Sequence, residues 1–203
     1  RDIYDVNTML DYCASHKNAV VIGGGLLGLE AAYGLKQRGM NVTVLHLTDR
    51  IMDRQLDAKA STMLKASIEA KGIEIITEAN TEALLGQEGH VQQLRLKDGR
   101  TLPADLVIFA VGIRPNAGLR CNRGVLVNDT MQTFDPSIYA VGECIEHRNQ
   151  TFGLVEPLWG QAFICASHLA EHGSLTFKAP TVPTQLKVSG CDVFSAGRID
   201  IEA

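Results

Sequence analysis

Residues 17–46 constrain the fold more than any other stretch, because three glycines in them stand between two patterns of regular structure. Gly23, Gly25 and Gly28 have the G-x-G-x-x-G spacing; a short apolar run precedes them and a helical pattern, residues 26–38, follows. Gly23 permits a tight turn off a strand, Gly25 leaves room for a pyrophosphate, and Gly28 lets a helix pack closely on a sheet. The stretch therefore predicts a strand, a glycine loop, a helix and a second strand.

The surroundings of this loop favour nucleotide binding. Gly39 ends the helical pattern and residues 42–46 follow as a strand, which is the context expected of a dinucleotide-binding fingerprint. A helix that begins at such a loop directs unpaired N–H groups and its positive dipole end toward phosphates. The alternative is a tight turn that only packs well. The predicted contact residues of the loop are Gly23, Gly24, Gly25, Leu26, Leu27 and Gly28.

One part of the fingerprint is missing at the end of the second strand. His46 stands where an acidic residue is expected to hold a ribose 2′-hydroxyl. Neutral histidine can accept a hydrogen bond from that hydroxyl, and charged histidine can pair with a 2′-phosphate. NADH is the preferred prediction, because no arginine replaces the acid, and NADPH stays open. Arg50 and Arg54 either reach an adenosine phosphate or are solvated.

Composition excludes several classes of function. The chain has 203 residues, a hydrophobic content of 45% and a net charge of −4, which is ordinary for a globular protein of one or two domains. Its 19 Lys and Arg residues are scattered, so no nucleic-acid partner is expected. No apolar run approaches the ~20 residues of a membrane span, and no signal peptide is visible. We expect a cytoplasmic protein without a membrane partner, and a homodimer is left open.

The five cysteines show neither a C-x-x-C pair nor metal-type spacing. Buried, reduced thiols are expected, and no metal site is predicted. A flavoprotein that passes electrons through its own disulfide would need a close cysteine pair. The five are Cys13, Cys121, Cys144, Cys165 and Cys191.

The first half of the chain reads as an α/β unit. Residues 2–16 predict a lead-in helix with Asp2 as its cap. A helix over residues 56–71 and a strand over residues 73–76 extend the β-α-β-α-β order, which implies a parallel sheet with right-handed crossovers. Short alternating segments and an Asp-Gly turn then predict an antiparallel meander, residues 81–102.

After the meander, residues 106–111 predict a central strand whose carboxyl end lies beside the glycine loop. The remaining pattern is weaker and predicts short strands with one helix. The strands are expected over residues 124–128, 138–141, 186–188 and 193–194, and the helix over residues 157–172.

Three strings together go beyond a generic α/β unit. They are V-V-I-G-G-G-L-L-G-L-E, D-G-R-T-L-P-A-D-L-V-I-F-A-V-G-I-R-P-N and D-P-S-I-Y-A-V-G-E-C, in that order. The chain thereby resembles the pyridine nucleotide-disulfide oxidoreductase superfamily of FAD- and NAD(P)H-dependent reductases. Looser strings, among them H-L-T-D-R-I-M-D-R-Q-L-D and F-G-L-V-E-P-L-W, are similar to the flavin-containing large subunit of assimilatory NAD(P)H nitrite reductases.

The resemblance implies roles for residues outside the glycine loop. Glu30 would lie near the nicotinamide, and Gly112, with Ile113 beside it, would lie against the cofactor. Glu143, preceded by Gly142, would hydrogen-bond the ribityl chain of the flavin. From the residues alone, the less favoured alternatives are a solvated helix residue for Glu30 and a turn acid for Glu143.

The chain departs from a complete member of this family. No earlier glycine-loop segment for FAD precedes the lead-in helix, and no cysteine cluster for siroheme and an iron–sulfur centre is present. We therefore expect a Rossmann-like parallel sheet with a meander insertion, plus part of a second, FAD-type domain. The expected division is a lead-in helix (1–16), an NAD(P)H domain (17–118), a return segment of the FAD domain (119–185) and the start of a further segment (186–203).

The function implied by the resemblance is electron input. The chain would bind NAD(H), pass a hydride to FAD held by the whole enzyme, and hold FAD weakly or not at all by itself. The whole enzyme would reduce nitrite to ammonia through a siroheme and iron–sulfur region. The alternatives are a reductase for rubredoxin or ferredoxin, and a non-catalytic NAD-binding domain.

Overall fold

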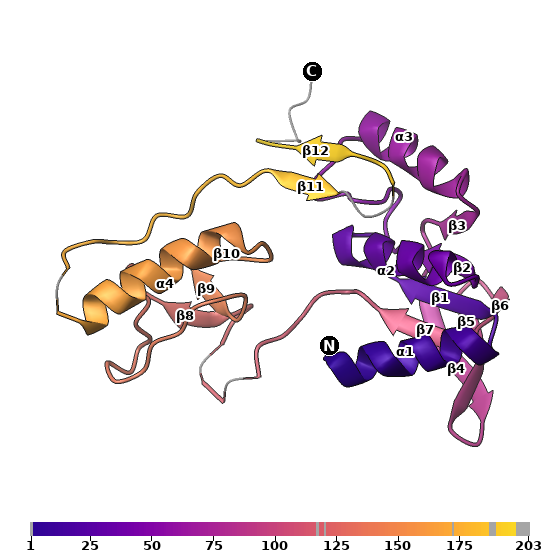
Figure 1. Cartoon of the computed structure of the whole chain (residues 1–203), viewed down its shortest axis with the longest axis horizontal. Coiled ribbons are helices and arrows are strands. Elements are labelled where there is room, and N and C mark those ends of the chain that lie inside the picture. Colours follow the sequence, from indigo (N-terminus) through magenta and orange to yellow (C-terminus); the bar gives the residue numbers. More distant parts are fainter. Residues whose placement is uncertain (1, 117, 120, 172, 187–189, 198–203) are drawn as a thin grey trace. The chain divides into compact units, whose positions relative to one another are not determined.

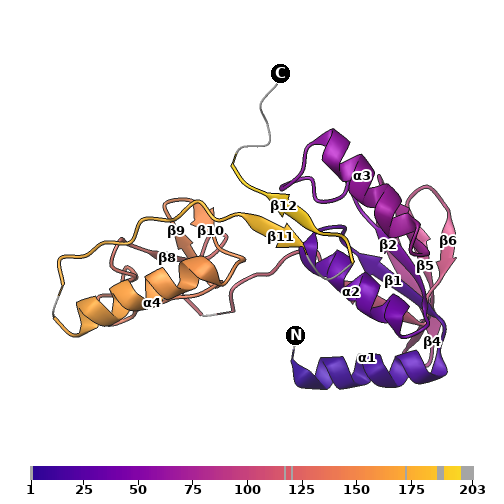
Figure 2. The same cartoon turned by 45° about the horizontal axis from the view of Figure 1, so that its top comes forward.

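The computed structural model describes residues 2–116, 118–119, 121–171, 173–186 and 190–197. The chain divides into two compact units, which are described separately. The first unit comprises Arg1–Val111 and Pro183–Ala203, and the second comprises Gly112–Val182. Figure 1 and Figure 2 label the helices and strands. No described helix has the length and apolar character needed to cross a bilayer.

A parallel sheet of four described strands forms the centre of the first unit, with the order β3-β2-β1-β7. All three neighbouring pairs are parallel, as the β-α-β-α-β pattern predicts. The strands are β1 (Asn18–Ile22), β2 (Asn41–Leu45), β3 (Ile73–Ile76) and β7 (Leu106–Phe109).

Helices α2 (Leu26–Gln37) and α3 (Ala58–Glu69) pack on this sheet, because each turns one apolar stripe toward it (Figure 2). Leu29 and Ala32 of α2 and Leu64 of α3 are buried in one cluster with the strand residues. The lead-in helix α1 (Ile3–Ser15) has no buried residue. Asp2 caps it, as predicted, by accepting hydrogen bonds from the backbone N–H groups of Tyr4 and Asp5 at 2.9 and 3.0 Å.

The predicted meander is present as an antiparallel sheet of β4 (Thr81–Gln87), β5 (His90–Leu96) and β6 (Thr101–Pro103). Leu94 and Leu96 are buried against Val20 and Leu45 of the parallel sheet. A short hairpin of β11 (Thr184–Leu186) and β12 (Val193–Ser195) belongs to the same unit. Its Leu186 is buried in the cluster with α2 and α3.

The second unit is small and held by polar as well as apolar contacts. Strands β8 (Val125–Val127) and β9 (Ile145–His147) pair in parallel, and β10 (Gln150–Thr151) pairs antiparallel with β9. Helix α4 (Glu156–Leu169) contributes Ile164 to a cluster with Met131, Ile145, Phe152 and Phe177.

Several predictions about elements need correction. Residues 106–111 are not a central strand, because β7 ends at Phe109 and has only β1 as a neighbour among the described strands. Residues 138–141 form no strand; Tyr139 makes a single bridge with Gln132. Strands β9 and β10 were not predicted. The predicted strand over residues 186–188 is β11 as far as Leu186, and its last two residues lie outside the described residues.

The prediction of buried thiols is wrong. All five cysteines are free, but Cys121 and Cys144 are exposed and the other three are partly buried. Cys13 and Cys191 have local partners: Cys13 Sγ donates to Met40 Sδ at 3.4 Å, and Cys191 Sγ lies 2.8 Å from Ser67 Oγ.

Candidate functional site

The glycine loop of the first unit joins β1 to α2 at the carboxyl end of the parallel sheet. Gly23 has φ of +119°, and a Cβ at this position would lie 2.3 Å from the carbonyl oxygen of Ala110, which follows β7. Its N–H donates to the carbonyl of Leu45 at 2.8 Å, and Ala110 N–H donates to Ile22 at 2.8 Å. The end of β7 therefore lies beside the glycine loop, as predicted.

Gly28 provides the close packing between helix and loop. A Cβ here would lie 1.8 Å from the carbonyl oxygen of Gly23, a distance that no side chain can take up. The first turn of α2 can approach the loop only because residue 28 has no side chain.

Gly25 differs from its neighbours, because a Cβ built on it meets no atom within 4 Å. It is the N-cap of α2 and no side chain caps that helix end. The first N–H groups of a helix have no acceptor within it, and in α2 these are the N–H groups of Leu26, Leu27 and Gly28. An open space in front of a positive helix end suits an anionic group.

Gly24 is held by the segment that follows β2. Its N–H donates to Nδ1 of His46 at 3.0 Å, and its carbonyl accepts from the N–H of Met52 at 2.9 Å. A Cβ on Gly24 would lie 2.8 Å from Cγ2 of Ile51 and 3.1 Å from Cγ of His46. His46, Ile51 and Met52 thus fix the middle of the loop; the contributions of Ile51 and Met52 were not predicted.

The other nitrogen of His46 is also turned away from solvent. Nε2 is buried without a hydrogen-bond partner in the described structure, and it lies 3.8 Å from Oδ1 of Asp53. Of the two arginines in the segment, Arg50 lies 3.7 Å from Asp49, and Arg54 is exposed. The structure therefore places His46 against the loop, with Nδ1 hydrogen-bonded to Gly24 and Nε2 buried.

The remaining predicted residues fall in three places. Glu30 lies on α2 and is partly buried. Gly112, with φ of +102°, and Ile113, which is exposed, follow β7 in the chain and belong to the second unit. Gly142 and Glu143 also belong to the second unit.

Gly142 and Glu143 precede β9. Gly142 has φ of +106°, and its N–H donates to Oε1 of Gln161 on α4 at 2.8 Å. Gln161 is completely buried, while the side chain of Glu143 is exposed. An exposed carboxylate beside a fixed glycine can accept hydrogen bonds from the hydroxyls of a ligand. Gln161 was not predicted, because nothing in its local sequence indicates a partner 19 residues away.

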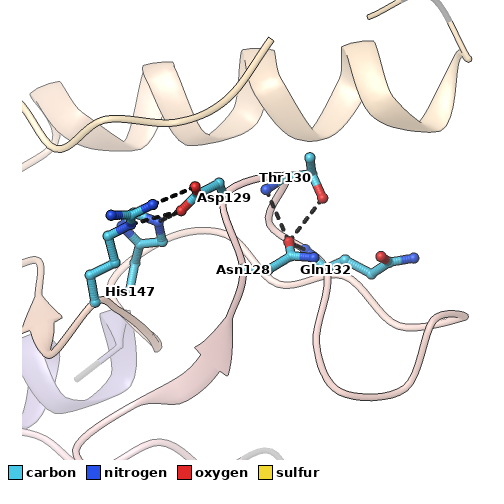
Figure 3. A network of polar contacts seen from close by, with 6 residues as sticks. Asn128, Asp129, Thr130, Gln132 and His147 are labelled. Atoms are coloured by element: carbon cyan, nitrogen blue, oxygen red, sulfur yellow. Dashed lines mark hydrogen bonds and ion pairs between the residues drawn. The ribbon is translucent and has the colours of Figure 1, made fainter. Parts of the chain in front are cut away.

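Asp129 is the centre of a polar network next to β8 and β9 (Figure 3). Its carboxylate accepts from Arg148 Nε and Nη2 at 2.9 and 2.6 Å, and lies 2.8 Å from Nε2 of the buried His147. The Arg148 guanidinium, and after it the His147 ring, hold the pKa of the Asp129 carboxyl well below its usual range. Asn128 caps the adjoining turn by accepting from Thr130 and Gln132 (Figure 3).

The parallel sheet, the glycine loop and the helix that begins at it define a Rossmann-type α/β protein. The chain belongs to the pyridine nucleotide-disulphide oxidoreductase family, whose model matches residues 2–162.

Similar proteins are reductases that use nicotinamide nucleotides. The chain is 50% identical to a nitrite reductase [NAD(P)H] of Bacillus subtilis, over 97% of this chain and 25% of that protein. It is 36% identical to a rubredoxin-NAD(+) reductase of Ectopseudomonas oleovorans, over 79% of this chain and 41% of that protein. The chain thus spans between a quarter and two fifths of the length of these relatives.

A solved structure shares the fold. An NAD-dependent persulfide reductase from A. fulgidus matches with a TM-score of 0.86 and 27% identity, over 97% of this chain and 38% of that one. The match supports the assignment of the chain to this family and, like the relatives, covers only part of the longer protein.

Proposed function

We propose that the chain is the NAD(P)H-binding, electron-input part of a flavin-dependent reductase, and that the whole enzyme reduces nitrite. When bound, reduced nicotinamide supplies a hydride and the flavin accepts it. The residues of this chain bind and orient the nucleotide; no group that takes part in bond breaking is assigned among them.

The observation that carries the proposal is the open space at Gly25, at the uncapped start of α2. Gly23 and Gly28 are enclosed by backbone atoms, so of these three glycines only Gly25 leaves room for a ligand. The N–H groups of Leu26, Leu27 and Gly28 are the donors that would meet a pyrophosphate there. Glu30, one turn further along α2, is the proposed neighbour of the nicotinamide.

The second unit supports a flavin as the electron acceptor. The exposed carboxylate of Glu143 fits the hydroxyls of a ribityl chain, and Gln161 holds the backbone before it. We propose residues 119–185 as the return segment of an FAD domain. Because this is one part of a flavin site, the chain is expected to bind FAD weakly by itself.

Nitrite is favoured as the final substrate by the 50% identity to a nitrite reductase. A second candidate is an NADH-dependent reductase for a small electron carrier, favoured by the 36% identity to a rubredoxin-NAD(+) reductase. Cysteine motifs of the siroheme type further along a parent protein would favour nitrite, and their absence from a complete parent sequence would favour the carrier. NADH is the proposed donor, with NADPH as the competitor.

Calorimetric titration of the chain with NADH, NADPH and FAD separately tests the binding proposal. We expect saturable binding of NADH. The Gly25→Val variant should weaken it roughly a hundredfold or more, because the valine side chain takes the space that a pyrophosphate needs.

Gly34→Val is the matched control. Gly34 lies on the same helix, also meets no atom within 4 Å of a built Cβ, and is exposed. Its variant should bind NADH like the unchanged chain. Absence of NADH binding by the folded chain, or equal binding by the Gly25→Val variant, would contradict a nucleotide site at the loop. Tight, stoichiometric binding of FAD would contradict the expected weak binding of flavin by the chain alone.

A further inference from the structure

The hydrogen bond between Gly24 and His46 fixes the protonation of the histidine ring. A backbone N–H is always a donor, so Nδ1 of His46, at 3.0 Å from Gly24 N, must carry a lone pair and not a proton. The neutral ring then has its proton on Nε2. That atom is buried and lies 3.8 Å from the carboxylate of Asp53.

This arrangement leaves no ring nitrogen for a nucleotide. Nδ1 is used by the loop and Nε2 is covered, although residue 46 stands at the strand end where an acid would hold the ribose. Nδ1 of His46 is instead directed at the backbone between Gly23 and Gly25. A residue at this position can therefore act on nucleotide binding through the loop and not through the ribose.

The contacts around Gly24 show what the ring does there. The carbonyl of Gly24 is held by Met52 N–H at 2.9 Å, and Ile51 covers its Cα. Without an acceptor at His46, the Gly24 N–H would be a buried donor with no partner, since Gly24 itself is buried. A buried unpartnered donor favours rearrangement of the peptide that carries it. That peptide joins Gly23 to Gly24, one residue before Gly25, where the ligand space opens.

We propose that His46 is a positioning residue: its neutral ring holds the Gly24 peptide in the conformation that keeps the pyrophosphate space open, and it does not read the ribose. The inference deepens the proposed function and rests on it. An acid at this position would affect both the affinity for nucleotide and the choice between NADH and NADPH. His46 would instead set the affinity for NADH and NADPH alike. The choice between the two nucleotides would then depend on other side chains of residues 47–54.

Two variants at residue 46 separate the acceptor from the ring. In His46→Asn, the amide oxygen is bonded directly to Cγ, as Nδ1 is in histidine, and can accept from Gly24. His46→Leu keeps the branched bulk and removes the acceptor. We expect His46→Leu to weaken NADH and NADPH equally, by roughly tenfold for one lost hydrogen bond, and His46→Asn to stay within about twofold of the unchanged chain. Thermal unfolding without nucleotide checks that both variants are folded.

Three outcomes would overturn the inference: a change in the NADH-to-NADPH ratio in His46→Leu, equal loss in both variants, or no loss in either. A changed ratio would mean that His46 contacts the ribose.

A nuclear magnetic resonance measurement keeps this inference separable from the proposed function. The ¹⁵N shifts of His46 should show a bare Nδ1 and a protonated Nε2, with a coupling across the hydrogen bond to the Gly24 amide. Protonated Nδ1 would overturn the inference even if NADH binds. Failure of the unchanged chain to bind nucleotide, with the coupling present, would instead defeat the proposed function.

Discussion

The glycines in and after the glycine loop differ in what a side chain would meet. Gly28→Ala places a methyl group 1.8 Å from a backbone oxygen of Gly23, and neither backbone segment can move without breaking the packing of α2 on the sheet. We expect the free energy of unfolding to fall by about 3 kcal/mol or more. Urea denaturation followed by circular dichroism measures the change.

Gly34→Ala is the matched control for that variant. Its built Cβ meets nothing within 4 Å, so the substitution should raise the free energy of unfolding by about 0.5–1 kcal/mol through helix propensity. A Gly28→Ala variant as stable as Gly34→Ala would mean that the close approach of α2 to the loop is not present in solution.

At the residue scale the sequence predicts the glycines well and their partners poorly. The G-x-G-x-x-G spacing is local, so the tight turn at Gly23 and the close packing at Gly28 follow from it. The partner of Gly24 is 22 positions away, and a histidine after a strand fits equally with a ribose contact and with a loop contact. Only the fold decides which of the two is made.

At the element scale, Asp105 joins the starts of β1 and β7. Its Oδ2 accepts from the N–H of Lys17 at 3.2 Å and from the N–H and side-chain amide of Asn18 at 2.8 and 3.2 Å. Asp105→Ala removes this charged acceptor, so we expect the free energy of unfolding to fall by about 1–3 kcal/mol at pH 7. Denaturant titration of the two proteins gives the difference.

The effect of Asp105 should depend on pH in a defined direction. The Asn18 N–H, as the largest influence, lowers the pKa of the Asp105 carboxyl from 3.8. A folded pKa below the unfolded one means that the carboxylate stabilises the fold above about pH 4 and loses this effect as the pH falls through the folded pKa. The difference in the free energy of unfolding between Asp105→Ala and the unchanged chain should therefore be constant near neutral pH and become smaller in acid.

Asp98→Ala is the control for that pH series. Asp98 also accepts side-chain hydrogen bonds, from Arg100 at 2.8 and 2.6 Å, but the pair lies exposed on a turn. An exposed ion pair stabilises the fold little, so Asp98→Ala should lower the free energy of unfolding much less than Asp105→Ala does. An Asp105→Ala variant that loses no more than Asp98→Ala would show that β1 and β7 are joined without the carboxylate.

Elements with strong local patterns were predictable, and those held by distant polar partners were not. The parallel order of β1, β2 and β3 follows from alternating strand and helix patterns. Strand β9 contains Glu146 and His147, which look like surface residues in the sequence but are buried. Glu146 is satisfied by the N–H groups of Arg123 and Gly124 at 2.8 and 3.3 Å, partners that no local pattern indicates.

At the scale of the whole molecule, the proposed site can be located without a variant. Hydrogen exchange in the presence of NADH should slow at residues 26–28, whose N–H groups are the proposed phosphate donors, and at residues 46–52, which hold Gly24. At a nucleotide concentration of 100 Kd, openings that require release of the ligand slow by roughly a hundredfold.

The meander, residues 81–103, is the internal reference for that measurement. It belongs to the same unit and packs on the parallel sheet through Leu94 and Leu96, but it contains none of the proposed phosphate donors, so its exchange should change little. Protection confined to the second unit would contradict the proposed site and place the nucleotide nearer to Glu143. A ligand seated at α2 slows the loop amides by direct contact, in addition to any general stabilisation of the first unit. Equal protection of the meander and the loop would therefore indicate general stabilisation alone.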